Sequence, residues 1–202
     1  MDLFYAPGTV ALASGIALEE AGIAYTPHRV DFASSEQRGA AYLALNPKGR
    51  VPSLVTERGV LTETPAILRY IATLNPGAGL WPADPFEAAR LDEVCAYLCS
   101  TVHVSHAHKF RGTRWSDDPE VIEGMKVKVT ENMTEHFRLL SGMIRGPYLL
   151  GETFSMADAY VHTLALWLPG DGVDPASLPV IAAHGAAMAA RPAVQRARAR
   201  LV

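Results

Sequence analysis

Hydrophobic and polar positions in the first eighty residues switch between strand-like and helix-like spacing. The predicted strands are 3–5, 25–32, 53–56 and 60–62. The predicted helices are 12–21, 36–45 and 64–74. Residues 57–59, Glu-Arg-Gly, are a hairpin signal between the last two strands, and the last helix has Thr64 as N-cap and Pro65 at its first position. The predicted order β-α-β-α-β-β-α describes a small α/β unit.

The pattern changes after a stretch rich in proline and glycine, residues 75–85, which is typical of a linker. Beyond it the spacing is helical. A capping residue followed by proline, a signal for a helix start, occurs at Asp84-Pro85, Asp118-Pro119 and Asp174-Pro175. Ser155 and Asp158 form a capping-box variant at another start. We therefore expect two domains, an α/β domain over residues 1–76 and an all-α domain over residues 86–202.

Composition narrows the possible functions mainly by exclusion. With 49% hydrophobic and 19% charged residues, the chain is typical of a globular protein. Eighteen Lys and Arg against 21 Asp and Glu give a formal charge of −3, so we expect no nucleic-acid partner. The longest apolar runs have about half of the ~20 residues that span a bilayer. The N-terminus carries the acidic Asp2 and is unlike a secretory signal. We expect a cytoplasmic protein without membrane association.

The two cysteines raise the question of a metal site. Cys95 and Cys99 lie four residues apart on one predicted helix, a poor frame for a disulfide, which suits a reducing compartment. With His103 and His106 they form a thiol and imidazole series. At 1.5 Å rise per residue its ends lie ~16 Å apart, too far for one tetrahedral site. We expect no metal, and a two-ligand site shared across a dimer stays open.

Five strings of the sequence together resemble one enzyme family. They are FYAPG at Phe4–Gly8, NPKGRVP at Asn46–Pro52, LTETPAIL at Leu61–Leu68, HKF at His108–Phe110 and GETFSMADAY at Gly151–Tyr160. In this order and spacing the chain resembles the cytosolic glutathione transferases, most closely their bacterial beta class. The resemblance implies a thioredoxin-like N-terminal domain, an all-helical C-terminal domain, glutathione as co-substrate and a homodimer.

The resemblance also implies how the backbone would hold glutathione, an extended peptide with two carboxylates, an amine and a thiol. It implies a cis bond between Val51 and Pro52, which turns the N–H and C=O of Val51 toward a ligand strand. Without the resemblance, a trans proline at a strand start is the simpler interpretation. Lys48 and Arg50 are candidates for the glycine carboxylate, although cations in a polar loop are commonly just solvated.

A second set of ligand contacts is expected at the start of the helix over 64–74. Free N–H groups and the dipole at this end suit a carboxylate next to Thr64, while Glu63 can hold the ligand amine. The alternative is that Thr64 only caps the helix and Glu63 only complements its dipole. Family members more often carry Ser in place of Thr64, and both side chains have the hydroxyl.

The residue that activates the thiol is the least determined part of the predicted site. Val10 stands where the beta class has Cys, which favours thiolate addition over thiol–disulfide exchange. A thiol of pKa ~8.5 must be shifted down by about two units to be mostly ionised at neutral pH. The candidates are the Thr9 hydroxyl, the Tyr5 phenol and, by resemblance, His108 with Lys109. The alternatives are a helix cap for Thr9, a core position for Tyr5 and a surface position for the His-Lys pair.

The expected function is a glutathione transferase that conjugates the thiolate to hydrophobic electrophilic small molecules, with Phe110, Trp115 and Trp167 as pocket walls. One alternative is a glutathione-binding or carrier protein with little catalysis. Another is a glutathione-dependent peroxidase, dehalogenase or isomerase. A Val10→Cys variant separates the first two, because a dormant binder gains disulfide exchange whereas conjugation by a working enzyme changes little.

Overall fold

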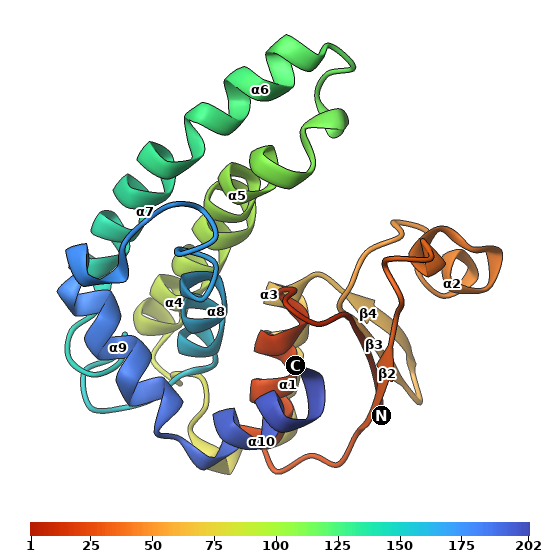
Figure 1. The fold of residues 1–202 in the computed structure, drawn as a ribbon. Helices are drawn as coiled ribbons and strands as arrows, with labels where there is room; N and C mark the ends of the chain where they lie inside the picture. The colour runs from red at the N-terminus through yellow and green to blue at the C-terminus, as the bar shows by residue number, and fades with distance from the viewer.

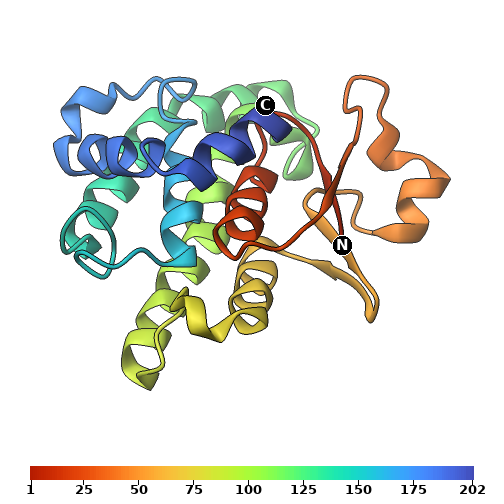
Figure 2. The same cartoon turned by 90° about the horizontal axis from the view of Figure 1, so that it is seen from below.

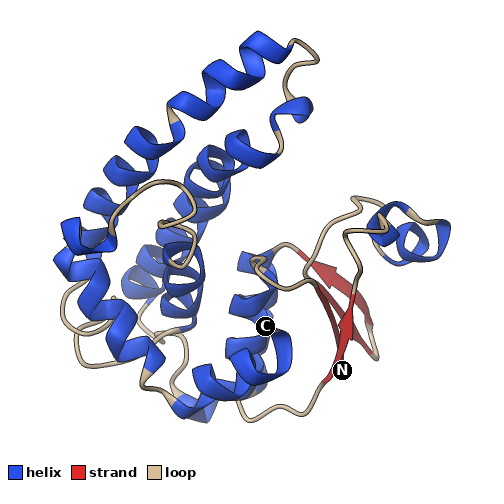
Figure 3. Ribbon diagram, viewed as in Figure 1, coloured by secondary structure: helices blue, strands red, loops and turns tan.

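Four short strands near the N-terminus form a mixed sheet of order β2-β1-β3-β4. They are β1 (Asp2–Tyr5), β2 (Thr26–Arg29), β3 (Ser53–Thr56) and β4 (Gly59–Thr62). β1 pairs parallel with β2 and antiparallel with β3, and β3 and β4 form the predicted hairpin. The structure, a computed structural model, describes all 202 residues, and Figure 3 shows the strands gathered at one side of the molecule.

Helices make up the rest of the molecule (Figure 1). Those in the first part are α1 (Ala11–Glu20), α2 (Ala40–Leu45) and α3 (Thr64–Leu74). Those that follow are α4 (Pro85–Tyr97), α5 (His103–Phe110), α6 (Pro119–Val127), α7 (Val129–Met143), α8 (Met156–Ala165), α9 (Pro179–Ala189) and α10 (Pro192–Leu201). None of them combines the length and apolar character that a membrane crossing requires. The predicted fold class, α/β followed by all-α, is confirmed.

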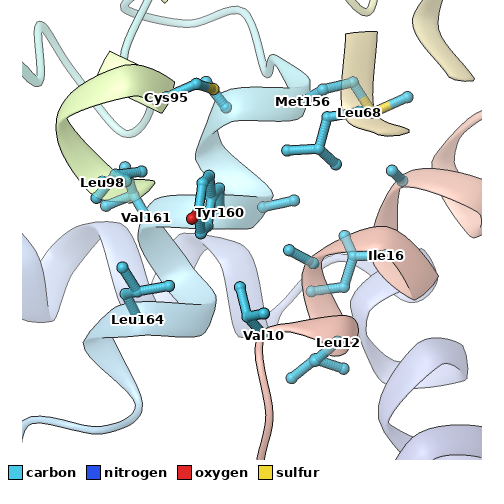
Figure 4. Packing of buried hydrophobic residues seen from close by; sticks show 14 of the residues in the cluster. Val10, Leu12, Ile16, Leu68, Cys95, Leu98, Met156, Tyr160, Val161 and Leu164 are labelled. Carbon is cyan, nitrogen blue, oxygen red and sulfur yellow. The ribbon is translucent and has the colours of Figure 1, made fainter. Parts of the chain in front are cut away.

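One hydrophobic core connects the two parts of the chain. A cluster of 40 buried residues extends from β1 and α1 to α8 and α9. In Figure 4, Val10, just before α1, lies beside Tyr160 and Leu164 of α8, and Ile16 in the middle of α1 belongs to the same cluster. The first residues of α1 are therefore positioned by a helix that lies far along the sequence.

The C-terminal helix α10 packs beside α1, as Figures 1 and 2 show from two directions. Ion pairs hold this contact: Arg191 pairs with Glu20, and Arg196 and Arg200 both pair with Glu19. The C-terminal end of α1 is thus tied to the last helix of the chain.

Local capping chemistry was predicted well. The Asp84 carboxylate accepts hydrogen bonds from the N–H groups of Phe86 and Glu87 at the start of α4, and Asp118 caps α6 in the same way. The capping box of Ser155 and Asp158 is present at the start of α8. Asp174 caps only a short 3₁₀ turn, because α9 begins later, at Pro179.

Three features differ from the prediction by more than a shift of one residue at an end. The second strand is shorter than 25–32, because only Thr26–Arg29 pairs with β1. The helix expected over 36–45 is interrupted at Gly39, whose extended backbone separates a 3₁₀ turn from α2. Thr64 is the first residue of α3 rather than its cap, because the helix is preceded by Glu63 with a φ of 70°.

Candidate active site

A cleft of about 950 Å³ opens beside the sheet and is closed on the other side by helical residues. Its walls come from the loop after β1, the loop before β3, the start of α3, and α5 with the turn that follows it. Six predicted site residues line it: Thr9, Arg50, Val51, Pro52, Glu63 and Thr64. The three predicted aromatic walls, Phe110, Trp115 and Trp167, line it as well.

The loop before β3 is held rigidly at the edge of the cleft. The Val51-Pro52 peptide bond is cis, as predicted. The Tyr42 hydroxyl and the Asn46 amide both donate to the carbonyl of Arg50 at 2.7 Å, and both contact the Ser53 hydroxyl. This buried network fixes the backbone around Val51, so that its polar groups can pair with an extended ligand.

A strained residue marks the end of the cleft at α3. Glu63 has positive φ, which is uncommon for a residue with a side chain and is frequent at ligand sites. Its Oε1 lies 2.7 Å from Nζ of Lys48, which also donates to Thr62. Lys48 therefore orients the Glu63 carboxylate and does not itself line the cleft. Next to it, α3 presents its free N–H groups and the Thr64 hydroxyl.

The loop at the start of α1 is tied down from two directions. The Thr9 hydroxyl donates to the carbonyl of Ala6 at 2.6 Å. Nε1 of Trp167 donates to the carbonyl of Gly8 at 3.0 Å, across 159 positions of the sequence. Val10 is 5% exposed and packs toward α8, so a thiol at that position would also be largely enclosed (Figure 4).

Loss of the Trp167–Gly8 hydrogen bond is expected to loosen this loop. We expect Trp167→Phe, which keeps an aromatic ring but removes the donor, to raise the Kd for glutathione by about two- to tenfold, the range for one hydrogen bond. Trp81→Phe is the matched control, because Nε1 of Trp81 has no hydrogen-bond partner and Trp81 does not line the cleft. Calorimetric titration of both variants measures this, and an equal effect in the two would contradict it.

Most of the α5 side chains line the cleft. They are His103, Val104, His106, Ala107 and Phe110. His108 is not among them and packs edge-on against Trp115, with ring centroids 4.5 Å apart.

The two histidines that line the cleft have well-defined surroundings. His106 stacks on Trp167 with ring centroids 4.1 Å apart, and its Nδ1 lies 2.9 Å from Oδ2 of the buried Asp171. His103 packs edge-on against the same indole, and its ring nitrogens have no hydrogen-bond partner in the protein. Burial, and then the neighbouring His106 and Arg114, lower the pKa of His103 to about 4. His103 is therefore neutral at pH 7, with one N–H free to donate.

Four predicted site residues are absent from the cleft lining: Tyr5, Lys48, His108 and Lys109. The Tyr5 hydroxyl donates to the carbonyl of Arg200, 3.2 Å away on α10, because its side chain faces the C-terminal helix. Lys109 donates to the carbonyl of Gly170. Together with His108 they are absent from the cleft lining, and their part in catalysis stays a prediction. Lys48 belongs with them, since its ammonium group is bound to Glu63.

The cysteines do not form a metal centre in this structure. No group of three or more His, Cys, Asp or Glu side chains is placed to hold a metal ion. Both thiols are free, and burial raises the pKa of Cys95 to about 12. Cys99 lines the cleft, where burial and then the Glu63 carboxylate raise the pKa of its thiol. Neither cysteine has the lowered pKa of a reactive thiolate.

Comparisons with known proteins identify the family. The profile described as "Glutathione S-transferase, N-terminal domain" matches residues 1–73. Glutathione S-transferase GstA of Escherichia coli O157:H7 is 32% identical over 98% of this chain and 96% of its own length. The chain belongs to the glutathione S-transferase family. As a member, it is a transferase whose co-substrate is glutathione.

Solved structures of glutathione transferases share the fold over nearly the whole length. A homologue from Sulfitobacter with bound glutathione is 46% identical, with a TM-score of 0.96 over 98% of this chain and 97% of its own. A beta-class enzyme from Sphingomonas chungbukensis is 33% identical, with a TM-score of 0.86 over 99% and 98%. Isomerases are also related, including maleylacetoacetate isomerase of Rhizobium meliloti, 30% identical over 90% of this chain and 87% of its own length.

Proposed function

We propose that this transferase bonds the sulfur of glutathione to an electrophilic carbon of small molecules with a hydrophobic body. One observation carries the proposal: the cleft brings the cis Val51-Pro52 turn, the start of α3 and the start of α1 together opposite aromatic walls. The carrier alternative needs the same glutathione contacts, and nothing in the structure or among the relatives favours it.

The expected contacts of glutathione follow from its chemistry. The Glu63 carboxylate binds the α-amine, and Thr64 with the free N–H groups of α3 binds the adjacent carboxylate. The N–H and C=O of Val51 pair with the cysteinyl residue of the ligand. The glycine carboxylate then meets the guanidinium groups of Arg50 and Arg38, which line the cleft.

The sulfur is expected near the start of α1, where two features favour the thiolate. The N-terminus of this helix favours negative charge. His103 offers an uncommitted N–H, whereas the Thr9 hydroxyl proton is already bound to Ala6. We therefore propose His103 rather than Thr9 as the donor to the thiolate. In the reaction a carbon–sulfur bond forms, and either the leaving group departs with its electron pair or the adjacent carbon of an activated double bond takes a proton.

Removing the His103 donor tests this assignment. We expect His103→Phe to keep the packing on Trp167 but to lower kcat/KM with chlorodinitrobenzene about tenfold and to raise the pKa of the bound thiol. His103→Gln, which restores an N–H donor, should recover part of both losses. Clear glutathione binding by the unmodified protein without any turnover would contradict the proposed function. Equal losses in both variants would contradict the role of His103.

The proposal also covers the class of transferase, the assembly and the location in the cell. We propose the beta class, supported by the matching strings and by the Sphingomonas relative, with Val10 as the departure. We propose a homodimer, the assembly implied by the family, which light scattering of the purified protein tests. We also propose the cytoplasm, the compartment where glutathione keeps thiols reduced. Cell fractionation tests that location.

A further inference from the structure

The cleft carries more positive charge than glutathione requires. Four arginines line it, Arg38, Arg50, Arg111 and Arg114, together with a single carboxylate, that of Glu63. The chain as a whole has a formal charge of −3, so this local excess runs against its net charge. Clefts lined by one sign of charge concentrate ligands of the opposite sign.

None of these four guanidinium groups is neutralised within the protein. The carboxylates that pair with arginine do so with Arg145, Arg191, Arg196 and Arg200, and the four cleft arginines donate no side-chain hydrogen bond. They also lie close enough to influence one another. Burial, and then the charges of Arg50, Arg111 and Arg38, lower the pKa of Arg114. Like charges held together in this way are stabilised when an anion binds between them.

Two of the arginines come from the helical part of the cleft. Arg111 is the C-cap that follows α5, and Arg114 is the last residue of the next 3₁₀ turn. The turn is seated tightly on α6, because a Cβ on Gly112 would lie 2.7 Å from Cγ2 of Ile122. Arg111 also lies 5.9 Å from the centroid of the Phe32 ring.

These two arginines are flanked by apolar surface. Phe110 and Trp115, their sequence neighbours, line the cleft and are largely exposed. The combination of exposed aromatic rings and unpaired guanidinium groups suits a ligand with an apolar body and an anionic end.

Matching the charged groups of glutathione with those of the cleft assigns different roles to the four arginines. In the proposed pose, Glu63 and α3 bind the charged groups of the γ-glutamyl end, and Arg38 and Arg50 face the glycine carboxylate. Arg111 and Arg114 then remain, beside the aromatic walls. We propose that they bind a carboxylate or sulfonate group on the acceptor, so that the preferred electrophiles are anionic molecules with an apolar body. This inference rests on the proposed function.

A pair of matched acceptors tests the inference. One is a chloronitrobenzene that carries a carboxylate para to the chlorine, and the other is the corresponding carboxamide. Each kcat/KM is divided by the rate of the uncatalysed reaction with glutathione, which corrects for their different reactivity. We expect the normalised value to be about tenfold higher for the carboxylate, the size of effect given by a hydrogen bond to a charged group.

The double variant R111Q/R114Q is expected to reduce that preference about tenfold, by a larger loss for the carboxylate than for the carboxamide. Arg138→Gln is the control, because Arg138 is exposed on α7 and does not line the cleft. Calorimetry of the glutathione-saturated protein with the unreactive nitrobenzoate and nitrobenzamide repeats the comparison without catalysis, and the unmodified protein should bind nitrobenzoate more tightly.

The outcomes separate the two proposals. Binding that favours nitrobenzoate, lost in R111Q/R114Q, without conjugation of either acceptor would support the anion site and contradict the transferase reaction proposed for the cleft. Conjugation of both acceptors without preference, in the unmodified protein and the double variant alike, would overturn the anion site alone. The anion site would also be overturned if the double variant bound glutathione more weakly, and to the same extent with either acceptor present. The two arginines would then bind glutathione rather than the acceptor.

Discussion

Replacing Asp158 by alanine is expected to destabilise the protein by about 3–5 kcal/mol, the range for leaving a buried charged network without one member. The carboxylate is fully buried, and four donors converge on it. Oδ1 accepts from Leu149 N–H at 2.8 Å and lies 3.0 Å from Nε2 of His184, and Oδ2 accepts from the N–H and hydroxyl of Ser155 at 2.8 and 2.7 Å. Without the carboxylate, these buried groups lose their partner.

The loss should be seen as a fall in Tm on the order of 10 °C in thermal unfolding, given about 2–4 °C per kcal/mol for a chain of this size. Asp158→Asn, which keeps one acceptor oxygen, should fall less. Asp118→Ala removes an exposed helix cap and should cost only about 1 kcal/mol. A loss no larger for Asp158→Ala than for Asp118→Ala would contradict the argument. Because α8 leads into Trp167, we also expect Asp158→Ala to weaken glutathione binding.

The second large effect is expected at Glu63. We expect Glu63→Gln to raise the Kd for glutathione about ten- to a hundredfold, because a charge-assisted contact with the ligand amine is lost. An analogue of glutathione without that amine makes the test specific. Its affinity should be nearly the same for the variant and the unmodified protein.

Calorimetric titration with both ligands gives the four affinities that are required. Glu57→Gln is the control, since Glu57 is exposed in the β3–β4 turn, away from the cleft lining. Equal losses of affinity for glutathione and for the analogue would show that Glu63 acts only on the shape of the loop. In that case the positive φ of Glu63 and its pairing with Lys48 would be structural features alone.

The features predicted correctly from the sequence depend on chemistry between near neighbours. The hairpin over β3 and β4, the extent of α3 and the caps at Asp84 and Asp118 were all predicted from residues a few positions apart. The cis bond at Val51-Pro52 is different, because it was expected only through the family resemblance. The division into residues 1–76 and 86–202 stays a prediction, and the buried cluster crosses it.

The features that were missed depend on contacts between distant segments. The pair His108-Lys109 was predicted from a string, but in the structure His108 packs against Trp115, Lys109 donates to Gly170, and the histidines that line the cleft are His103 and His106. The sequence analysis considered His103 and His106 only as metal ligands, although their spacing of three residues already placed them on one face of the helix. The hydrogen bond from the Trp167 indole to Gly8 and the grouping of four arginines in the cleft join distant segments. No pattern of neighbouring residues in the sequence predicts either of them.

The ionisation of bound glutathione tests the central claim most directly. Ultraviolet difference titration of the thiolate in the complex, from acid to alkaline pH, gives the pKa of the bound sulfur. We expect it to lie at least about one unit below the ~8.5 of a free thiol, since the start of α1 and His103 both favour the anion. A bound thiol that titrates at the free value, or a protein that does not saturate with millimolar glutathione, would contradict this account.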